Sequence, residues 1–441
     1  MTGVTGSSGP RGAQGHTGPR REGVAAGYQE RGTTMWLTGA TVVDGTGSDP
    51  RPDRTVLVED GRIAALDGTP PAGAEVLDCS GLTITPGLID AHVHFGLSSP
   101  IEASLTRGLS VAELAADMFE NCRQTLDAGF TTVRDTGGID GGLAGVVAKG
   151  KVPGPRILQC GPVLCQTGGH GHMASEWEPT ADWTDHHIPG LRSMSFLCDG
   201  PDEMRKNARE AFRRGADFLK LCVTGGVVSR HDKLTDTQFD VAEIAAAVAE
   251  ATARGTYVTV HAHNNAGIRN AVTAGVRCVE HGSQIDEESA ALMAEHDVAH
   301  VPTLAVVHAL LDDATEAGLP AGIADRVGVA LQGQIDAIHA SRAAGVRIGS
   351  GSDLIGPKQD GRGRELLLRS EIETPMAALV SATRVNADIL GIGADVGTVE
   401  IGKRADLAAF RGNPLDDPKL FADRAAVALV VQNGAVVKDV R

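Results

Sequence analysis

Three pairs of histidines, each separated by a single residue, have the spacing of metal ligands on a β-strand. Residues i and i+2 of a strand point to the same face, so both imidazoles of a pair can reach one ion. The 441-residue chain has 15 histidines, and the pairs are His92/His94, His170/His172 and His261/His263. All three fall at or just after the end of a segment expected to be a strand. The repetition favours a metal site over unrelated core histidines.

Two more candidate ligands follow later strands. His281 stands in the sequence VEHG, and Asp353 ends the stretch GSGSD. Taken singly, His261 or His281 could be a hydrogen-bonded core or helix-cap histidine, and Asp353 could be a helix N-cap. A carboxylate at the end of a strand can instead bind a metal and accept a proton from metal-bound water. Their shared position after strand-like segments favours the metal-site interpretation.

Lys220 stands in the middle of the apolar segment FLKLCV at residues 218–223. A lysine there is costly to bury unless it has a function. Burial favours the neutral amine, which can add CO2 to become a carbamate. The carbamate has two anionic oxygens, suited to bridging two metals about 3.5–4 Å apart. The alternative is a lysine whose side chain reaches solvent at the rim of the fold.

A basic loop and a cysteine near Lys220 have two interpretations each. Residues 229–233 (SRHDK) could attract an anionic substrate or form a solvated loop, and the solvated loop is favoured. Cys222 could be a sensitive thiol near the metals, but packing in the core is favoured. Nothing in the sequence supports a cysteine nucleophile.

The elements that must position these residues alternate between strands and helices. Ala-rich amphipathic patterns such as residues 111–126 and 241–254 predict helices between the strands. The expected strands are residues 83–94, 131–134, 156–164, 218–223, 257–263, 278–280, 300–303 and 347–349. Eight such repeats over about 270 residues fit an α/β fold, the (β/α)8 TIM barrel, whose chemistry lies at the carboxyl ends of the strands.

Short strands at both ends of the chain predict a small β-sandwich-like domain beside the barrel. The expected division is a disordered extension at 1–34, the barrel at 86–390, and the two parts of the small domain at 35–85 and 391–441. In the extension, Gly recurs at every third position from 3 to 18. This is the spacing of collagen, but the run is too short for a stable triple helix. Met35 is an alternative start of the protein.

The composition excludes several classes of protein. With 40 Lys and Arg against 56 Asp and Glu, the formal net charge is −16, which argues against a nucleic-acid-binding protein. No apolar run approaches the roughly 18 residues of a transmembrane helix, and no secretory signal is visible. Seven cysteines without a CxxC pattern argue against a disulfide framework or a four-cysteine zinc site. We therefore expect a cytoplasmic enzyme with a small-molecule substrate and no nucleic-acid or membrane partner.

Together these segments make the chain similar to the amidohydrolase superfamily. More narrowly, it resembles the imidazolonepropionase-like and Xaa-Pro-dipeptidase-like metal-dependent hydrolases, the ochratoxinase-like group. The motifs that carry the resemblance are PGLIDAHVH at 86–94, GFTTVRD at 129–135, ADFLKLCVTGG at 216–226, VHAH at 260–263, VEHG at 279–282, GSD at 351–353, GKRADL at 402–407 and NPL at 413–415.

The resemblance implies a binuclear metal centre, most often of zinc. The ligands would be His92, His94 and Asp353 for one ion and His261 and His281 for the other, with carboxylated Lys220 as the bridge. Lys220 favours the dipeptidase-like branch, because true imidazolonepropionases use one metal and lack this lysine. The family pattern also places His170 and His263 near the substrate, where they would stabilise the oxyanion or orient a substrate carboxylate.

The implied activity is hydrolysis of the amide bond of a dipeptide, N-acyl amino acid or similar small amide by metal-bound hydroxide. Asp353 would take the proton of the nucleophile and pass it to the leaving nitrogen. The alternative is a cyclic amide or amidine, a urea or a carbamate at the same metal site. A non-catalytic metal-binding scaffold is disfavoured, because it needs neither Asp353 nor Lys220. Where many relatives have Asp, this chain has His172, so the substrate stays open. Because relatives often assemble, a homo-oligomer is a further expectation.

Overall fold

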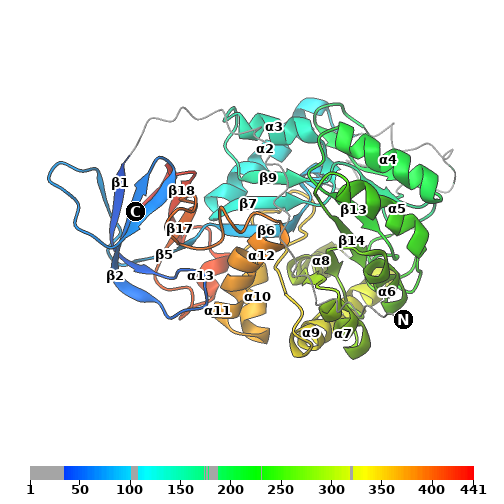
Figure 1. Ribbon diagram of the computed structural model, residues 1–441. Helices are drawn as coiled ribbons and strands as arrows, with labels where there is room; N and C mark the ends of the chain where they lie inside the picture. The colour runs from blue at the N-terminus through cyan, green and yellow to red at the C-terminus, as the bar shows by residue number, and fades with distance from the viewer. Residues whose placement is uncertain are drawn as a thin grey trace, which may run out of the picture.

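The computed structural model describes residues 34–100, 108–172, 174, 177, 187–229, 231–317 and 321–441. Figure 1 shows a β domain on the left and a larger α/β body on the right. Apart from Thr34, the expected N-terminal extension lies outside the described residues. Among the helices that are described, none combines the length and the apolar character that crossing a membrane requires.

One eight-stranded sheet joins the two ends of the chain in the β domain. Its path is β19-β18-β17-β5-β1-β2-β3, and β4 pairs with β1 at the side. The strands are β1 (Met35–Val42), β2 (Arg51–Glu59), β3 (Arg62–Leu66), β4 (Val76–Asp78), β5 (Leu82–Pro86), β17 (Leu407–Arg411), β18 (Val427–Gln432) and β19 (Ala435–Asp439). Strand β5 is parallel to β1 and antiparallel to β17, so Ile84 lies next to Ala409. Apolar side chains from both ends, such as Leu37 and Leu429, share one core.

Two tight turns of this sheet have the geometry that their residues favour. The turn between β2 and β3 has φ angles of 49° at Asp60 and 77° at Gly61. The turn between β18 and β19 has φ angles of 50° at Asn433 and 77° at Gly434. Positive φ at both central residues is required in a type I′ turn, and Asp-Gly and Asn-Gly adopt it readily.

Parallel strands form the centre of the α/β body. One sheet has the order β6-β7-β9, and a second has the order β12-β10-β13-β14-β15-β16. The strands are β6 (Leu88–Val93), β7 (Phe130–Asp135), β9 (Arg156–Gln159), β10 (Val163–Cys165), β12 (Ser195–Leu197), β13 (Leu219–Cys222), β14 (Val258–Ala262), β15 (Cys278–His281) and β16 (Ala299–Val301). A short antiparallel pair, β8 (Gly138–Ile139) and β11 (Arg192–Ser193), stands apart from them.

Helices follow the strands and cover the outside of the body (Figure 1). They are η1 (Phe95–Leu97), α2 (Val111–Asp127), α3 (Gly141–Ala148), α4 (Pro201–Arg213), α5 (Val241–Thr252), α6 (Asn265–Ala274), α7 (Glu287–Glu295), α8 (Leu304–Ala317), α9 (Ala321–Ala343), α10 (Arg364–Ile372), α11 (Pro375–Val380), η3 (Ser381–Val385), α12 (Asn386–Ile389) and α13 (Lys419–Ala422). Capping side chains fix several helix starts. Asn264, directly after His263, accepts a hydrogen bond from Gly267 N and begins α6.

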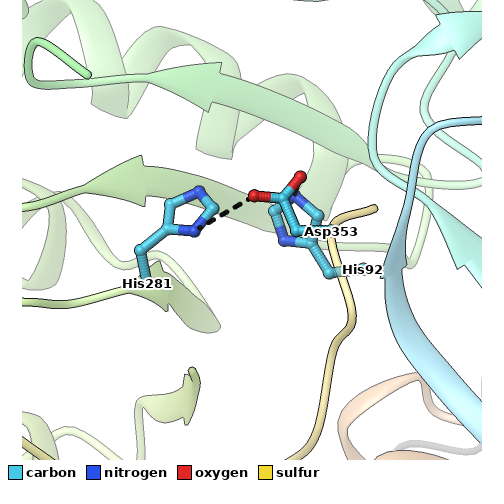
Figure 2. Close-up of side chains that lie close together, drawn as sticks. All are labelled: His92, His281 and Asp353. Carbon is cyan, nitrogen blue, oxygen red and sulfur yellow. Dashed lines mark ion pairs between the residues drawn. The ribbon is translucent and has the colours of Figure 1, made fainter. Parts of the chain in front are cut away.

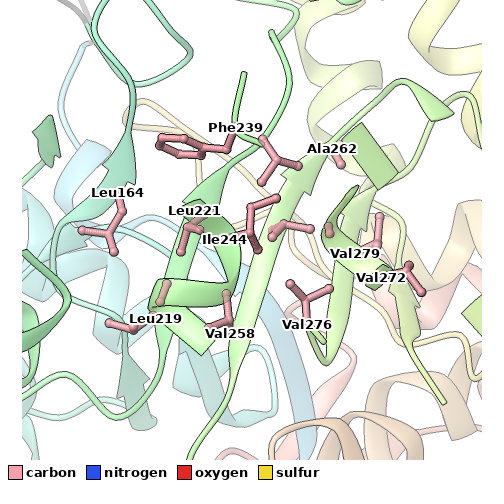
Figure 3. Packing of buried hydrophobic residues seen from close by; sticks show 14 of the residues in the cluster. Leu164, Leu219, Leu221, Phe239, Ile244, Val258, Ala262, Val272, Val276 and Val279 are labelled. Atoms are coloured by element: carbon pink, nitrogen blue, oxygen red, sulfur yellow. The ribbon is translucent and has the colours of Figure 1, made fainter. Parts of the chain in front are cut away.

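The largest apolar cluster packs helices α4 to α7 against strands β13 to β15. Figure 3 shows Leu219 and Leu221 of β13 in this cluster with Ile244 of α5. Because side chains alternate along a strand, Lys220 and Cys222 point to the opposite face of β13. The outer face of β13 therefore belongs to the apolar core, and its inner face carries the lysine.

Three expected strands differ from the observed ones. Residues 83–94 divide at Gly87 into β5 and β6, which belong to different sheets. A Cβ atom at Gly87 would clash with the Thr131 side chain, so a glycine is needed for this close approach. Residues 156–164 divide into β9 and β10 around Gly161, which has a φ of 69°. Residues 347–349 are not a strand, and Ile348 makes only an isolated parallel bridge to His300.

Backbone hydrogen bonds also connect the two parallel sheets to each other. Asp217 N donates to Gln159 O at 2.8 Å, which links the start of β13 to β9. Ala91 N donates to Ser350 O at 3.0 Å, which places the segment after Ile348 beside β6. The carboxyl half of β6 is thereby brought near the segment that leads to Asp353.

Candidate metal centre

A histidine of β6, a histidine of β15 and an aspartate after residues 347–349 meet inside the body. The ligand atoms of His92, His281 and Asp353 all lie within 4.8 Å of one another. Oδ1 of Asp353 is 3.4 Å from His92 Nε2, and Oδ2 is 3.7 Å from His281 Nδ1. Figure 2 shows the Asp353 carboxylate beside both imidazoles. The two oxygens of one carboxylate therefore face imidazoles from two different strands.

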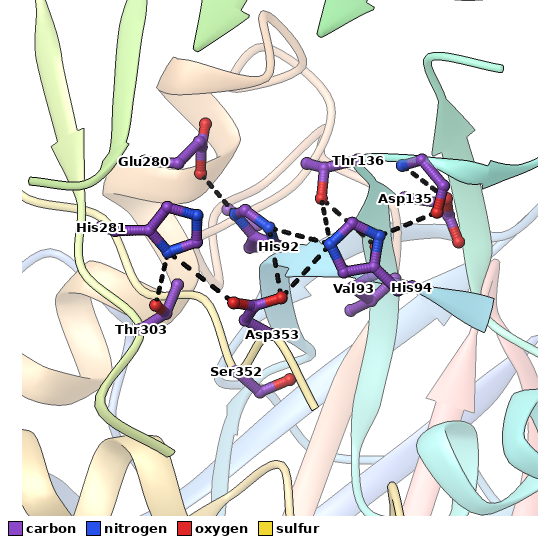
Figure 4. Close-up of polar contacts among 12 residues, drawn as sticks. His92, Val93, His94, Asp135, Thr136, Glu280, His281, Thr303, Ser352 and Asp353 are labelled. Atoms are coloured by element: carbon purple, nitrogen blue, oxygen red, sulfur yellow. Dashed lines mark hydrogen bonds and ion pairs between the residues drawn. The ribbon is translucent and has the colours of Figure 1, made fainter. Parts of the chain in front are cut away.

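His94 completes the group on the β6 side. Its Nε2 is 3.2 Å from His92 Nε2 and 3.2 Å from Asp353 Oδ1. Its Nδ1 lies 2.8 Å from Gly137 O, and since a carbonyl only accepts, Nδ1 carries the proton. The lone pair of His94 Nε2 is then directed at the centre. The expected pair His92 and His94 therefore converges on one point with Asp353 (Figure 4).

The remaining predicted histidines extend the cluster. The ring centroid of His261 is 4.5 Å from that of His281, 4.7 Å from that of His263 and 4.0 Å from that of His170. Nδ1 of His263 is 2.8 Å from Ser283 Oγ, and Nδ1 of His170 forms a hydrogen bond with the hydroxyl of Ser229. The structure thus brings every histidine predicted as a ligand or substrate contact into one continuous group.

Lys220 is buried on the inward face of β13, with 3% of its surface exposed. It lies in register with Thr259 of β14, two residues before His261. The charge of Lys220 acts to lower the pKa of His92 and of Asp353. The Lys220 amine therefore lies close enough to the cluster to interact with it electrostatically. Within the part of the chain that the structure describes, its amine has no hydrogen-bond or ion-pair partner. A buried lysine in this situation is costly unless it is modified or binds a ligand.

Burial keeps most of these imidazoles neutral. It lowers the pKa of His92 to about 4, that of His263 to about 3 and that of His281 well below its ordinary value. His94 differs: burial acts to lower its pKa, but the hydrogen bond and charge of Asp353 outweigh it and raise the pKa. Burial acts to raise the pKa of Asp353, but the imidazoles of His92 and His94 hold it below its usual range. Neutral imidazoles and an ionised carboxylate are the forms that bind metals.

Two members of the cluster have an uncommon backbone conformation. The φ angles are 67° at His281 and 54° at Asp353, in the left-handed region. Nε2 of His300, which is buried, lies 3.0 Å from His281 O, and Thr303 Oγ1 lies 2.8 Å from His281 Nδ1. Asp353 N donates to His92 O at 2.8 Å. Such strained residues are concentrated at functional sites, where the surrounding structure holds them in place.

Sequence reasoning missed the buried charged residues around the cluster. Glu280 Oε2 is 2.9 Å from His92 Nδ1, and Glu280 Oε1 is 2.6 Å from Arg134 Nη2. Asp90 Oδ1 accepts a hydrogen bond from His92 N at 3.1 Å, and Asp90 Oδ2 pairs with Arg362 at 3.3 Å. The available signal was a charged residue inside an apolar strand, as in the segments GLIDA, TTVRD and CVEHG. Asp90, Arg134 and Glu280 were part of the motifs that carry the family resemblance, but no role was assigned to them from the sequence.

Other predicted features lie at the edge of the site. His172 Nδ1 accepts a hydrogen bond from Gly168 N at 2.8 Å, so this histidine supports its own loop. In the loop at 229–233, Asp232 accepts from Gly226 N, and His231 Nε2 lies 2.7 Å from Ala174 O. Arg230 lies outside the described residues. Cys222 is a buried thiol on the same face of β13 as Lys220, and burial raises its pKa to about 12, so it stays protonated near neutral pH.

The chemistry of this donor set fits divalent cations. Buried neutral imidazoles and carboxylate oxygens are the ligands that zinc and similar ions take in proteins. The convergence of His92, His281 and Asp353 within 4.8 Å supplies three donors from three separate segments. Without a cation, burying this cluster of polar side chains away from water would cost free energy and contribute little to the stability of the fold.

Comparison with known proteins identifies the family of this chain. The model of the amidohydrolase family matches residues 83–437. Ochratoxinase from Aspergillus niger is 30% identical over 440 residues, covering 95% of this chain and 89% of that protein. A prolidase crystallised with N-methylphosphonate-L-proline has a TM-score of 0.87 and 34% identity, covering 92% of this chain and all of that chain. A Xaa-Pro dipeptidase with methionine bound in its active site has a TM-score of 0.82 and 27% identity, over 92% of this chain and all of that chain.

The resemblance inferred from the motifs is thereby confirmed. Membership of the family implies a TIM barrel with an additional domain, and the parallel sheets and the β domain agree with this. Because the family model and these relatives span most of its length, the chain belongs to the amidohydrolase family and is a hydrolase of carbon–nitrogen bonds.

Proposed function

We propose that this enzyme hydrolyses the amide bond of a dipeptide, an N-acyl amino acid or a similar small amide at a centre of two divalent metal ions. The observation that carries the proposal is the convergence of His92, His281 and Asp353, with His94 and His261 adjoining them. The similarity to an ochratoxinase, a prolidase and a Xaa-Pro dipeptidase supports an amide substrate.

The ligand set proposed for this centre divides between two ions. The residues are His92, His94 and Asp353 for one ion and His261 and His281 for the other, with carboxylated Lys220 between them. When bound, the ions, most simply zinc, would lower the pKa of a water molecule and polarise the scissile carbonyl. The lone amine of Lys220 on the inward face of β13 supports its carboxylation, because a carbamate would satisfy both the burial and the ligand count.

Asp353 is placed to move a proton. Its carboxylate is ionised, half-buried and in contact with both strands' imidazoles, so it can accept a proton from the attacking water. Rotation about the side chain then delivers that proton to the leaving nitrogen. An amine must leave protonated, so this transfer is what makes C–N cleavage possible near neutral pH.

His170 and His263 are proposed to bind the substrate. Each is neutral at pH 7 because burial lowers its pKa, to about 4 and about 3. Each has Nδ1 engaged by a serine hydroxyl, Ser229 and Ser283. If Nδ1 accepts from the serine, Nε2 carries the proton and can donate it to the carbonyl oxygen or the carboxylate of the substrate.

Several finer points of the fold and of the assembly stay predictions. We infer that the two parallel sheets close into the expected (β/α)8 barrel through residues 347–349, supported by the hydrogen bonds that join this segment to β6 and β16. A sandwich-like shape of the small domain and a homo-oligomer stay predictions as well.

The test is a screen of the zinc-loaded protein in bicarbonate buffer against dipeptides and N-acyl amino acids, with detection of the released amine. Asp353→Asn and Lys220→Ala should abolish release. Asp297→Asn is the matched control, because Asp297 also has a positive φ, 55°, and lies outside the cluster. If protein with close to two zinc ions per chain releases no amine, the proposal of a linear amide substrate is wrong. A cyclic substrate is then indicated if ring opening yields a single product.

A further inference from the structure

A buried network of polar side chains lies behind His92. Glu280 of β15 has no exposed surface, and its Oε2 is 2.9 Å from His92 Nδ1. Its Oε1 is 2.6 Å from Arg134 Nη2 and also accepts from the Thr259 hydroxyl. Arg134 Nε donates to Ala91 O at 2.6 Å, directly before His92. Figure 4 shows Glu280 and Asp353 contacting opposite nitrogens of the His92 ring.

The charges of this network decide where the proton of His92 lies. The Arg134 guanidinium keeps the Glu280 carboxylate ionised, so this carboxylate can only accept hydrogen bonds. Nδ1 of His92 must therefore be the donor, and Nε2 is left with a lone pair. That Nε2 lies 3.2 Å from His94 Nε2 and 3.4 Å from Asp353 Oδ1, on the side of the other candidate ligands.

The backbone of β15 allows two consecutive residues to serve the centre. In a regular strand Glu280 and His281 would point to opposite faces. Glu280 is in register with His261 of β14, on the inward face. The φ of 67° at His281 turns the His281 side chain toward Asp353, so it faces the centre as Glu280 does. One short segment therefore supplies a predicted ligand and the partner of a ligand on β6.

We propose that Glu280, held by Arg134, is a positioning residue that fixes the ring orientation and the tautomer of His92 for metal binding. The inference rests on the metal centre under the proposed function. The competing explanation is an ion pair that stabilises only the core, with no influence on the metal. A carboxylate behind a metal-bound imidazole commonly raises metal affinity about 10- to 100-fold.

The comparison that tests it uses Glu280→Gln. In wild type, Oε2 accepts from His92 and Oε1 accepts from Arg134. A carboxamide has an NH2 group, which only donates, at one of these two positions, so one of the two contacts is lost. Glu373→Gln is the matched control, because Glu373 forms a buried ion pair with Arg369 at 2.5 Å. Zinc affinity is measured by competition with a chromophoric chelator, and ligand geometry by the visible absorption of the cobalt-substituted protein. Glu280→Gln should weaken zinc binding about 10- to 100-fold and change the cobalt spectrum, whereas Glu373→Gln should do neither.

A measurement on the unmodified protein covers the case in which Glu280→Gln does not fold. In zinc-loaded protein labelled with 15N-histidine, the His92 signal, identified by its loss in His92→Asn, should show a proton on Nδ1 that exchanges slowly with water. A proton on Nε2, or none on Nδ1, overturns the inference. Zinc binding and cobalt spectra unchanged in folded Glu280→Gln overturn it too. If the wild-type protein itself binds no zinc, the proposed metal centre fails instead, so the two failures are distinguishable.

Discussion

Glu365 on α10 is expected to make the stability of this enzyme fall as the pH rises. Its side chain is 1% exposed, and Oε2 accepts a hydrogen bond from Ala305 N at 2.8 Å, at the start of α8. Among the described residues, Oε1 has no partner. Burial raises its pKa from 4.5 to about 8, although the charge of Arg369 opposes the shift. Near neutral pH, the folded protein thus keeps this carboxyl group protonated.

The sign and size of the effect follow from proton binding. Between pH 4.5 and 8, the folded state holds the Glu365 proton and the unfolded state has lost it. The contribution is therefore complete below pH 4.5 and is lost as the pH rises to 8, at about 1.4 kcal/mol per pH unit. From pH 6 to pH 8 the free energy of unfolding should fall by about 2 kcal/mol through this one group, because the slope halves as the pH reaches the folded-state pKa of about 8. Glu365→Gln removes the titration and keeps an acceptor for Ala305 N.

The assay is urea unfolding of the metal-free protein at pH 6, 7 and 8, followed by circular dichroism. The free energy difference between Glu365→Gln and wild type should move in favour of the variant by about 2 kcal/mol over this range. Glu373→Gln, directly after the end of α10 and with an ion-pair partner in Arg369, controls for the loss of a buried carboxylate. Parallel pH dependence of Glu365→Gln and wild type would refute the reasoning.

Three further outcomes are expected. Thr303→Val removes the hydroxyl that lies 2.8 Å from His281 Nδ1 and should weaken zinc binding about tenfold in chelator competition. Unchanged zinc affinity would contradict a role of Thr303 in orienting His281. Arg362→Met leaves Asp90 as a buried unpaired charge and should lower the free energy of unfolding by about 3–5 kcal/mol. Adding Asp90→Asn should restore part of this stability. A double variant whose loss equals the sum of the two single losses would contradict the pairing. Removal of the metal with a chelator should lower the urea midpoint of unfolding. Zinc at about 100 times its dissociation constant should raise the free energy of unfolding by about 2.7 kcal/mol. A midpoint that does not depend on zinc would count against the metal centre.

The parts of the site that follow simple strand geometry were predictable from the sequence. His92 and His94 were expected to converge, and their Nε2 atoms lie 3.2 Å apart. Lys220 was expected to be buried with the candidate ligands, and it lies on the inward face of β13, in register with Thr259. These predictions need only the alternation of side chains along one strand. Whether Lys220 is carboxylated, and which residues hold which ion, stay predictions.

The parts that depend on local backbone exceptions or on distant partners were not predictable. Alternation would turn His281 away from the face that Glu280 occupies, and only the φ of 67° brings it back. The partner of Glu280 is Arg134, 146 positions earlier in the chain. That pairing depends on how the strands are ordered and registered, and periodicity carries no information about either. The break at Gly87 has the same origin, because it is required by Thr131 of a neighbouring strand.

The left-handed conformation of Asp353 decides which substitution can test its chemistry. Asparagine and aspartate adopt positive φ more readily than other residues with a Cβ atom. Asp353→Asn therefore preserves the turn whose backbone nitrogen donates to His92 O at 2.8 Å. Asp353→Val would add strain of about 1–2 kcal/mol to that turn and would displace His92 as well. A loss of activity in Asp353→Asn thus reports the missing carboxylate, and any greater loss in Asp353→Val reports the geometry that the turn imposes on the ligands of β6.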